Sequence, residues 1–245
     1  MEYHQISVKL QHIMTSSLPL LATLQSHAAL HGEALAHLLP DRVITYRRFW
    51  SRIERAAARL QGEWGIQPDD TVAYIGNGHP DAIVLYCALM RLGALLLPLE
   101  GYALAQAQLV MQQANVKLVV HDDDIKIEGM PAYVLSLMLA DWCHFDPFIL
   151  QEDEQRPSLL IPQKNGNVQA LLKTSVRQFL QMPASDVRAN PFANDKADHA
   201  GVLVGRSVFD VSTFAGIIVP ALLAVQPMRF AVIEECLDKR LRKAS

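Results

Sequence analysis

The amino-acid sequence predicts an α/β fold in which βαβ units build a parallel sheet with helices on both faces. Two segments, 71–75 and 94–98, are short and apolar, which suits buried strands. Segment 82–92 between them is almost wholly apolar and long enough for a buried helix. Strand, helix and strand over short connections form a βαβ unit, and such units normally pair their strands in parallel beneath helices.

An amphipathic helix precedes the first of these strands. Thr45 can cap its N-terminus, because a threonine hydroxyl accepts a hydrogen bond from a free amide of the first turn. Apolar residues then recur at helical spacing, with arginines on the other faces. The apolar positions are Phe49, Ile53, Ala56, Ala57 and Leu60. Further along, Pro80 can begin the 82–92 helix and Gly93 can end it.

Residues 43–100 also carry a series of short motifs. They are Thr45-Tyr46, the segment 65–73, Asn77, Gly93-Ala94 and Pro98-Leu99. In this order and spacing they resemble the N-terminal region of the adenylate-forming superfamily, which includes acyl-CoA synthetases, the adenylation domains of non-ribosomal peptide synthetases, and luciferases. The resemblance is clearest from Ala28 to Asp124. It implies the fold of the N-terminal subdomains of an adenylate-forming enzyme, and a carboxylate-activating reaction that uses ATP and magnesium.

Composition narrows the class of partner. The 22 Lys and Arg residues against 25 Asp and Glu give a net charge of -3, so we expect neither nucleic acid nor a membrane as a partner. The three cysteines are far apart and odd in number, which argues against a disulfide framework or a zinc site and favours the cytoplasm. The spacing of His27, His31 and His37 favours surface or helix-cap positions over a metal site.

The segments that follow continue the α/β pattern. The predicted elements are a helix at 104–114, strands at 116–121 and 133–137, and a surface connection at 141–157. Leu104, Leu109 and Val110 are expected to face inward from the helix. The run Asp122 to Asp124 follows the first strand. Consecutive carboxylates do not converge on one cation without a special loop, so a solvated strand end explains them better than a magnesium site.

A phosphate loop is the feature of the superfamily that would hold ATP. There, a strand leads into a loop rich in Gly, Ser and Thr and ending in Lys-Gly, whose backbone amides and lysine approach the phosphates. The matching segment, 158–172, keeps the strand at 159–161 but has one glycine and no Ser or Thr after Pro162. The loop is therefore degenerate.

Three residues occupy the position of this degenerate loop and are the candidate cofactor-binding residues. They are Lys164, Asn165 and Gly166. The alternative is a plain hairpin turn formed by Asn165, Gly166 and Asn167, which the composition favours.

The candidate substrate-binding residue is Asp210. Helices are predicted at 173–182 and 217–223, and between them Phe209-Asp210-Val211-Ser212 resembles an element of amino-acid adenylation domains. The resemblance implies that Asp210 pairs with the α-ammonium group of a substrate, as a carboxylate at a pocket mouth can. The alternative is that Asp210 and Ser212 cap the helix that follows, because both residue types are good N-caps.

The predicted domain organisation is a leader at 1–17, a truncated AMP-binding-type domain at 18–225 and a charged helix at 226–245. The resemblance covers the front half of a family enzyme, and no catalytic residue is assigned. We expect an AMP-dependent synthetase/ligase-like protein of the acyl- or aminoacyl-adenylate-forming type that is inactive alone. Its substrate would be a small carboxylic or amino acid, with ATP and magnesium as cofactors if it is active.

Two alternatives stand beside this expectation. The chain is a non-catalytic accessory or binding subunit that keeps only the fold, or an unrelated α/β enzyme or small-molecule binder. The ordered motifs from Thr45 to Leu99 disfavour the unrelated protein. A sheet cut before its last strands leaves an edge and an apolar face uncovered, so we also expect self-association or a partner chain.

Overall fold

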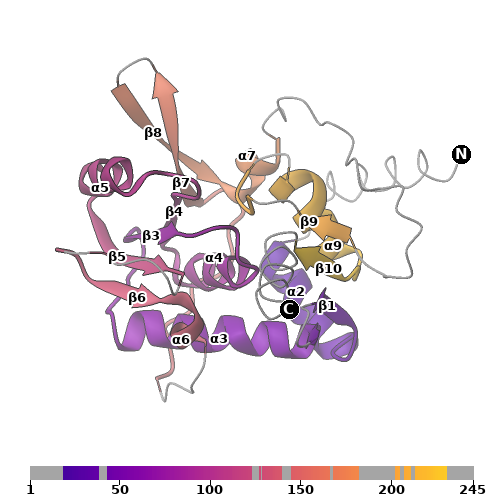
Figure 1. Cartoon of the computed structure of the whole chain (residues 1–245). Coiled ribbons are helices and arrows are strands. Elements are labelled where there is room, and N and C mark those ends of the chain that lie inside the picture. Colours follow the sequence, from indigo (N-terminus) through magenta and orange to yellow (C-terminus); the bar gives the residue numbers. More distant parts are fainter. Residues whose placement is uncertain are drawn as a thin grey trace, which may run out of the picture.

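The computed structural model describes residues 19–38, 43–122, 127, 129–139, 145–165, 168–181, 202–204, 207–210 and 213–230. Its main body is a six-stranded sheet in the order β6-β5-β3-β4-β7-β8 (Figure 1). The strands are β3 (Thr71–Ile75), β4 (Leu95–Pro98), β5 (Val116–His121), β6 (Ala132–Val134), β7 (Pro157–Asn165) and β8 (Val168–Ser175). Every neighbouring pair is parallel except the antiparallel hairpin β7–β8. The predicted α/β fold with a parallel sheet is confirmed.

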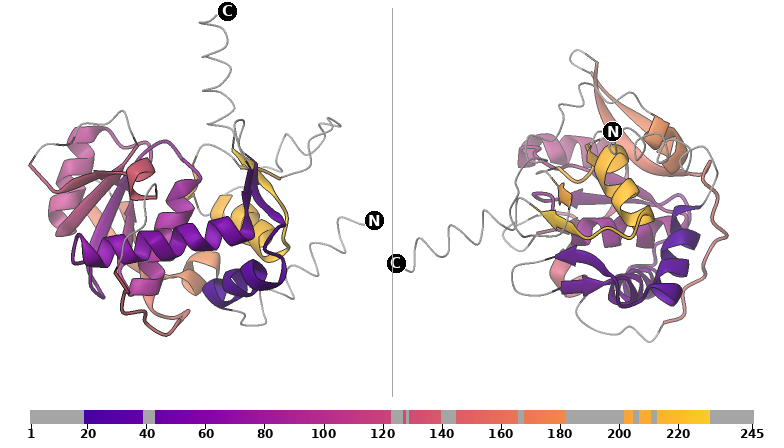
Figure 2. Two further views of the ribbon diagram at one scale, coloured as in Figure 1. Left: turned by 90° about the horizontal axis from the view of Figure 1, so that it is seen from below. Right: turned by 90° about the vertical axis from the view of Figure 1, so that its right-hand side faces the viewer.

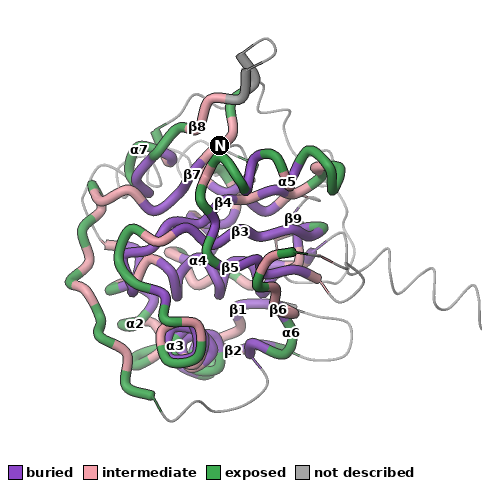
Figure 3. Tube along the Cα trace, turned by 90° about the vertical axis from the view of Figure 1, so that its left-hand side faces the viewer, coloured by how far each residue is buried: buried purple, intermediate pink, exposed green. Residues whose placement is uncertain are grey.

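Helices cover both faces of this sheet. They are α3 (Tyr46–Gly62), α4 (Asp81–Leu92) and α5 (Leu104–Gln113). Val72 and Tyr74 of β3 belong to the apolar cluster that contains α3 and α4, whereas Ala73 and Ile75 belong to the cluster that contains α5. Successive side chains of a strand point to opposite faces, so one strand supplies both clusters. Strand β3 is accordingly buried along its whole length (Figure 3), and the prediction of helices on both faces is confirmed.

The residues predicted to bound the helices act as expected. Thr45 caps α3, because its Oγ1 accepts a hydrogen bond from the amide of Arg48 at 3.4 Å. Gly93 ends α4 in the left-handed conformation, with a φ of 70°. Residues with a β-carbon rarely adopt this conformation, which explains a glycine at this position.

A second sheet joins segments from the two ends of the described chain. Its order is β2-β1-β10-β9, and its strands are β1 (Leu35–Leu38), β2 (Val43–Thr45), β9 (Val202–Val204) and β10 (Met228–Phe230). Figure 2 shows its indigo and yellow strands side by side, and β1 pairs in parallel with β10. The charged helix predicted at 226–245 is wrong at its start, because Met228–Phe230 is a strand. Residues 231–245 and the predicted leader at 1–17 lie outside the described residues.

The three histidines near the N-terminus occupy different environments. His31 is exposed, and Nε2 of half-buried His27 lies 3.2 Å from the carbonyl oxygen of Leu223, at the end of α9 (Val219–Leu223). These are the predicted surface and cap positions. His37 is fully buried in β1, with its ring centroid 4.9 Å from that of Phe49 and 5.4 Å from that of Phe230. The prediction is therefore wrong for His37.

The inward face of α5 differs from the prediction. Leu104 and Leu109 are 41% and 67% exposed, whereas Val110 is buried together with Ala107 and Met111. Apolar residues lie on more than one side of this helix, so periodicity alone does not select the face that packs on the sheet.

Two other elements have different bounds from those predicted. The strand expected at 133–137 is the short β6 followed at once by α6 (Leu135–Met138). The helix expected at 173–182 is α7 (Val176–Gln181), because β8 continues to Ser175. Pairing with β7 keeps residues 173–175 extended.

A distant glutamate caps the first described helix, α2 (Leu20–Leu30). Pro19 precedes α2 and supplies no side-chain cap. Glu152 instead accepts hydrogen bonds from the amides of Leu21 at 2.8 Å and Ala22 at 2.9 Å. Burial raises the pKa of the Glu152 carboxyl, and the two amide bonds oppose that shift. The surface connection thus satisfies amides that the helix itself leaves unpaired.

Replacing Glu152 with alanine is expected to lower the free energy of unfolding by about 1 kcal/mol, the usual cost of losing an N-cap acceptor. Urea unfolding followed by circular dichroism measures the change. Glu33→Ala is the control, because Glu33 is 79% exposed and pairs only at the surface with Arg47; it is expected to change stability by less than about 0.5 kcal/mol. Equal effects of the two substitutions would contradict the capping role.

Candidate functional site

The carboxyl edge of the main sheet is the candidate site. In open α/β sheets, ligands bind beyond the carboxyl ends of the strands, where successive connections leave in opposite directions. Here the chain passes from β3 to β4 on one side and from β5 to β6 on the other. The connections therefore diverge between β3 and β5, and the residues that follow β3, β4 and β5 lie at this edge.

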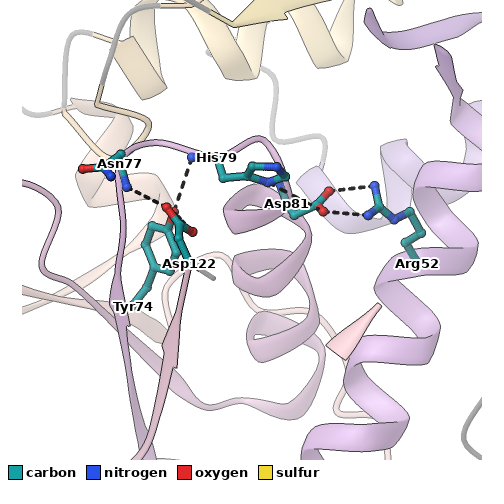
Figure 4. Close-up of polar contacts among 6 residues, drawn as sticks. All are labelled: Arg52, Tyr74, Asn77, His79, Asp81 and Asp122. Carbon is teal, nitrogen blue, oxygen red and sulfur yellow. Dashed lines mark hydrogen bonds and ion pairs between the residues drawn. The ribbon is translucent and has the colours of Figure 1, made fainter. Parts of the chain in front are cut away.

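The loop after β3 is held by a hydrogen-bonded network (Figure 4). The Tyr74 hydroxyl donates to Oδ1 of Asp122 at 3.1 Å, and the amide of Asn77 donates to Oδ2 of Asp122 at 2.9 Å. The amide of His79 donates in turn to the Tyr74 hydroxyl at 3.3 Å. A β-carbon at Gly76 would collide with the Tyr74 hydroxyl and the Asp122 carboxylate. Asp122 thus ties the β5 end to the predicted turn, and glycine is the residue that fits there.

The Tyr74 hydroxyl of this network is buried, and burial changes its pKa. Burial raises the pKa of Tyr74, and the nearby carboxylates of Asp122 and Glu100 raise it further. Tyr74 therefore stays protonated at neutral pH and acts as a hydrogen-bond donor, which is the role that Asp122 requires of it.

A buried ion pair fixes the helix that follows this loop. Arg52 of α3 contacts Asp81 of α4 in a two-pronged arrangement, Nη1 to Oδ1 at 2.6 Å and Nη2 to Oδ2 at 2.7 Å (Figure 4). The Asp81 side chain is 2% exposed and that of Arg52 is 10% exposed. The amide of Asp81 also donates to Nδ1 of His79 at 3.2 Å. The pair sets the position of α4 relative to α3 and of the loop before it.

Glu100, just after β4, holds a segment that is distant in the sequence. Its Oε2 accepts hydrogen bonds from the Ser207 hydroxyl at 2.7 Å and the Phe209 amide at 3.1 Å, and its Oε1 accepts one from the Val208 amide at 3.3 Å. Burial raises the pKa of the Glu100 carboxyl, and these three donors oppose that shift. The residues before Asp210 are therefore bound to the carboxyl edge of the main sheet.

Asp210 itself is exposed and begins a helical segment. Its Oδ2 accepts a hydrogen bond from the amide of Thr213 at 3.1 Å, the kind of contact that a capping side chain makes three positions along the chain; Ser212 lies outside the described residues. Thr213 is followed by a π-helix, η1 (Phe214–Ile218), which continues into α9. Pro220 has no amide hydrogen to bond to residue 216, which accounts for the wider turn. Pairing of Asp210 with a substrate ammonium stays a prediction.

The region predicted to correspond to the phosphate loop is a β-hairpin. Strands β7 and β8 pair from Pro157 opposite Ser175 to Asn165 opposite Val168. The backbones of Lys164 and Asn165 lie in β7, while Gly166 lies outside the described residues. The antiparallel pairing is that of a hairpin, as the alternative predicts, and the turn residues Gly166 and Asn167 lie outside the described residues. Cofactor binding by Lys164, Asn165 and Gly166 stays a prediction.

The two groups of residues predicted to bind ligands lie in different parts of the fold, Asp210 near the carboxyl edge of the main sheet and the backbones of Lys164 and Asn165 in β7. Asp210 is joined to this edge through the contact of the preceding Phe209 amide with Glu100. Asn77, which belongs to the motif series of the resemblance, is joined to it through Asp122. Sequence reasoning missed Glu100, whose local signal is its place two residues after the strand predicted at 94–98. In the part of the chain that the structure describes, no group of three or more His, Cys, Asp or Glu residues is arranged to hold a metal ion. Nor is any described helix long and apolar enough to cross a bilayer.

Comparison with solved structures identifies the same architecture in adenylate-forming enzymes. The o-succinylbenzoate CoA synthetase MenE of Bacillus subtilis aligns over 87% of this chain with a TM-score of 0.70 at 12% identity. The N-terminal subdomain of Klebsiella oxytoca NpsA aligns over 87% of the chain with a TM-score of 0.67 at 16% identity. The matched regions make up 44% and 53% of those chains, respectively. These likenesses show a shared fold, that of the N-terminal subdomains of such enzymes.

Sequence comparison agrees with the fold. A carboxylic acid reductase of Mycobacterium tuberculosis is 39% identical over 73 residues, which is 29% of this chain and 6% of the reductase. The sequence profile described as AMP-binding enzyme matches residues 24–176, more than half of the chain. The matched region begins within α2 and ends at the start of α7. The chain therefore belongs to the AMP-binding enzyme family, the adenylate-forming enzymes to which acid–CoA ligases and adenylation domains belong.

Proposed function

We propose that this protein is an acyl- or aminoacyl-adenylate-forming ligase-like protein that does not hold ATP phosphates between β7 and β8, and so forms no acyl-AMP as an isolated chain. The observation that carries the proposal is the ladder between these strands, which continues to Asn165 opposite Val168. Two residues remain between the last paired positions. Enzymes of this family use ATP and magnesium, and the paired backbone of this hairpin supports the proposal that it does not bind the phosphates.

The reason is geometric. A phosphate loop wraps successive backbone amides around one anion, which requires a curved backbone with glycines. In an extended strand, successive amides point in opposite directions and cannot converge on one phosphate. Residues 161–165 and 168–172 are extended and paired. Their backbone amides therefore cannot converge on one phosphate.

A second candidate function draws on the same observation. A family member without a working phosphate loop can keep the acid-binding part of the fold and serve as a binding or accessory subunit. The ligand would be a small carboxylic or amino acid. The exposed residue Asp210, which lies four residues before η1 and near the carboxyl edge, supports recognition of an ammonium group.

Calorimetric titration of the full chain with magnesium and ATP, together with acid-dependent pyrophosphate exchange, tests the proposal. We expect neither ATP binding nor exchange. The Bacillus subtilis MenE enzyme, assayed with o-succinylbenzoate, is the positive control. Exchange by this chain alone would overturn the proposal.

Lys164→Ala makes the titration specific to the hairpin. ATP binding that is lost in this variant would show that Lys164 holds a phosphate, which contradicts the proposal. ATP binding that survives the substitution would place a nucleotide elsewhere and leave the hairpin argument intact, provided that no exchange occurs.

A further inference from the structure

Glu100 occupies a rigid position at the carboxyl edge of the main sheet. The amide of Leu99 donates to the carbonyl oxygen of Tyr74 in β3 at 2.8 Å, and the amide of Tyr102 donates to the carbonyl oxygen of Leu99 at 3.3 Å. Residues 99–102 thus form a β-turn. Its third residue, Gly101, has a φ of 73°, a conformation that favours glycine. The backbone of Glu100 is thus held by the sheet on one side and by its own turn on the other.

The Glu100 carboxylate accepts all of its described hydrogen bonds from a segment that is 107–109 residues away in the sequence. All three of its described donors, one hydroxyl and two amides, come from Ser207, Val208 and Phe209. These donors are neutral, and none of the described ion pairs includes Glu100. Both oxygens of this half-buried carboxylate accept donors, whereas a glutamine would offer one acceptor oxygen and a serine one hydroxyl.

Aromatic packing completes the restraint on the residue before Asp210. The Phe209 ring packs edge-on against Tyr74 and Tyr86, with centroids 6.2 and 5.9 Å away, and stacks on Phe214 at 6.0 Å. On the other side of Asp210, its carbonyl oxygen accepts a hydrogen bond from the amide of Phe214 at 2.8 Å. Asp210 is therefore exposed but held on both sides.

We propose that Glu100 is a positioning residue for ligand recognition: it holds residues 207–209 so that the Asp210 carboxylate meets the ammonium group of an amino-acid ligand. This inference rests on the proposed role of Asp210. The retained charge of Glu100 has a second consequence. It contacts the amide of the residue before Asp210 and adds to the negative potential at this edge, which favours a cationic group over a neutral one.

The test compares the affinities of the full chain for aromatic and aliphatic L-amino acids with those for the matching des-amino acids, such as phenylalanine and 3-phenylpropionate. The measured quantity is the ratio of the two dissociation constants, obtained by calorimetry. We expect the best amino acid to bind at least about tenfold more tightly than its des-amino acid, the contribution of one charge-assisted hydrogen bond. Asp210→Asn should bring the ratio close to one.

Glu100→Gln is expected to reduce the same ratio by about fivefold or more, because an amide group replaces one acceptor oxygen and removes the charge. Hydrogen exchange at the amides of Val208 and Phe209 should become faster in this variant. Glu152→Gln is the matched control, since Glu152 is also a half-buried glutamate that accepts two backbone amides. It is expected to lower stability but leave the ratio unchanged, which separates positioning from general destabilisation.

The outcomes distinguish the proposed role of Asp210 from the proposed role of Glu100. A ratio unchanged by Asp210→Asn, or a wild-type chain with no preference for the amine, overturns the role of Asp210 and this inference with it. A ratio that falls in Asp210→Asn but not in Glu100→Gln overturns the inference about Glu100 alone. If Glu100→Gln does not fold, Ser207→Ala removes one of the three donors and is expected to lower the ratio in the same direction; an unchanged ratio in that variant would likewise overturn it.

Discussion

Asp81→Asn is expected to lower the free energy of unfolding by about 3–5 kcal/mol, a larger loss than that expected for the capping residue Glu152. The change preserves the size of the side chain and removes its charge. Arg52 would then be a buried cation with no anion, since its guanidinium contacts both carboxylate oxygens of Asp81 within 2.7 Å and is 10% exposed. In the wild-type chain, the ion pair with Asp81 offsets the free-energy cost of removing Arg52 from water. Urea unfolding at neutral pH measures the effect.

A double-substitution cycle measures the interaction free energy between Arg52 and Asp81 separately from their other contacts. Adding Arg52→Met to Asp81→Asn removes the uncompensated charge, and much of the lost stability should return. The surface pair Arg47 and Glu33 is the control, because the two side chains are 68% and 79% exposed; Glu33→Gln should change stability by less than about 0.5 kcal/mol. A loss of stability below about 1 kcal/mol for Asp81→Asn would show that this ion pair does not hold α4 against α3.

Acid is expected to destabilise the wild-type chain by about 3 kcal/mol more than the His37→Leu variant between pH 7 and pH 4. Burial lowers the pKa of His37 from 6.5 to about 4; the Asp81 carboxylate opposes this shift, while Arg52 and His79 add to it. The unfolded chain therefore takes up this proton at a higher pH than the folded chain. The stability is fully present above pH 6.5 and is lost as the pH falls toward 4.

The structure explains why His37 cannot accept the proton easily. Neither of its ring nitrogens has a hydrogen-bond partner among the described residues, and the ring lies between Phe49 and Phe230. Protonation would place an unpaired cation where β1 meets β10. His37→Leu removes the titrating group and two unsatisfied nitrogens, so its stability should depend less on pH and should not fall at pH 7.

Unfolding curves measured at intervals from pH 7 to pH 4 provide this comparison. The control is His31→Gln, since His31 is exposed and its loss should leave the pH dependence as in the wild type. Parallel pH profiles for wild type and His37→Leu would show that other groups cause the acid sensitivity. The buried position of His37 would then be irrelevant to it.

Local patterns in the sequence were enough to predict the core of the main sheet. The bounds of β3, α4 and β4 follow from an apolar strand, an apolar helix and a glycine at its end, all within about 30 residues. Thr45 is predicted as a cap because capping is a contact between residues three apart. A turn at Asn165 to Asn167 and a strand at 159–161 were also predictable from local composition, whereas the length of β8 to Ser175 was not.

Tertiary contacts decided the features that local patterns do not encode. β10 is a strand because it pairs with β1 and β9, and the charged sequence after it gives no sign of those partners. Leu109 of α5 is exposed because the sheet selects one of several apolar sides of that helix. Sequence periodicity specifies the kind of element, but the packing partner specifies the face.

The candidate site shows the same division. The sequence by itself determined the family resemblance, the degenerate composition at Lys164 to Gly166 and the choice of Asp210 as a candidate. Only the tertiary structure decided that Glu100 holds residues 207–209, that Arg52 pairs with Asp81 and that His37 is buried without a partner. The first two are contacts across more than 100 and across 29 residues, and the third is the meeting of two distant strands. Burial of apolar surface drives the folding that brings these groups together. Their ion pairs and hydrogen bonds form only in the folded chain, so the sequence alone does not reveal them.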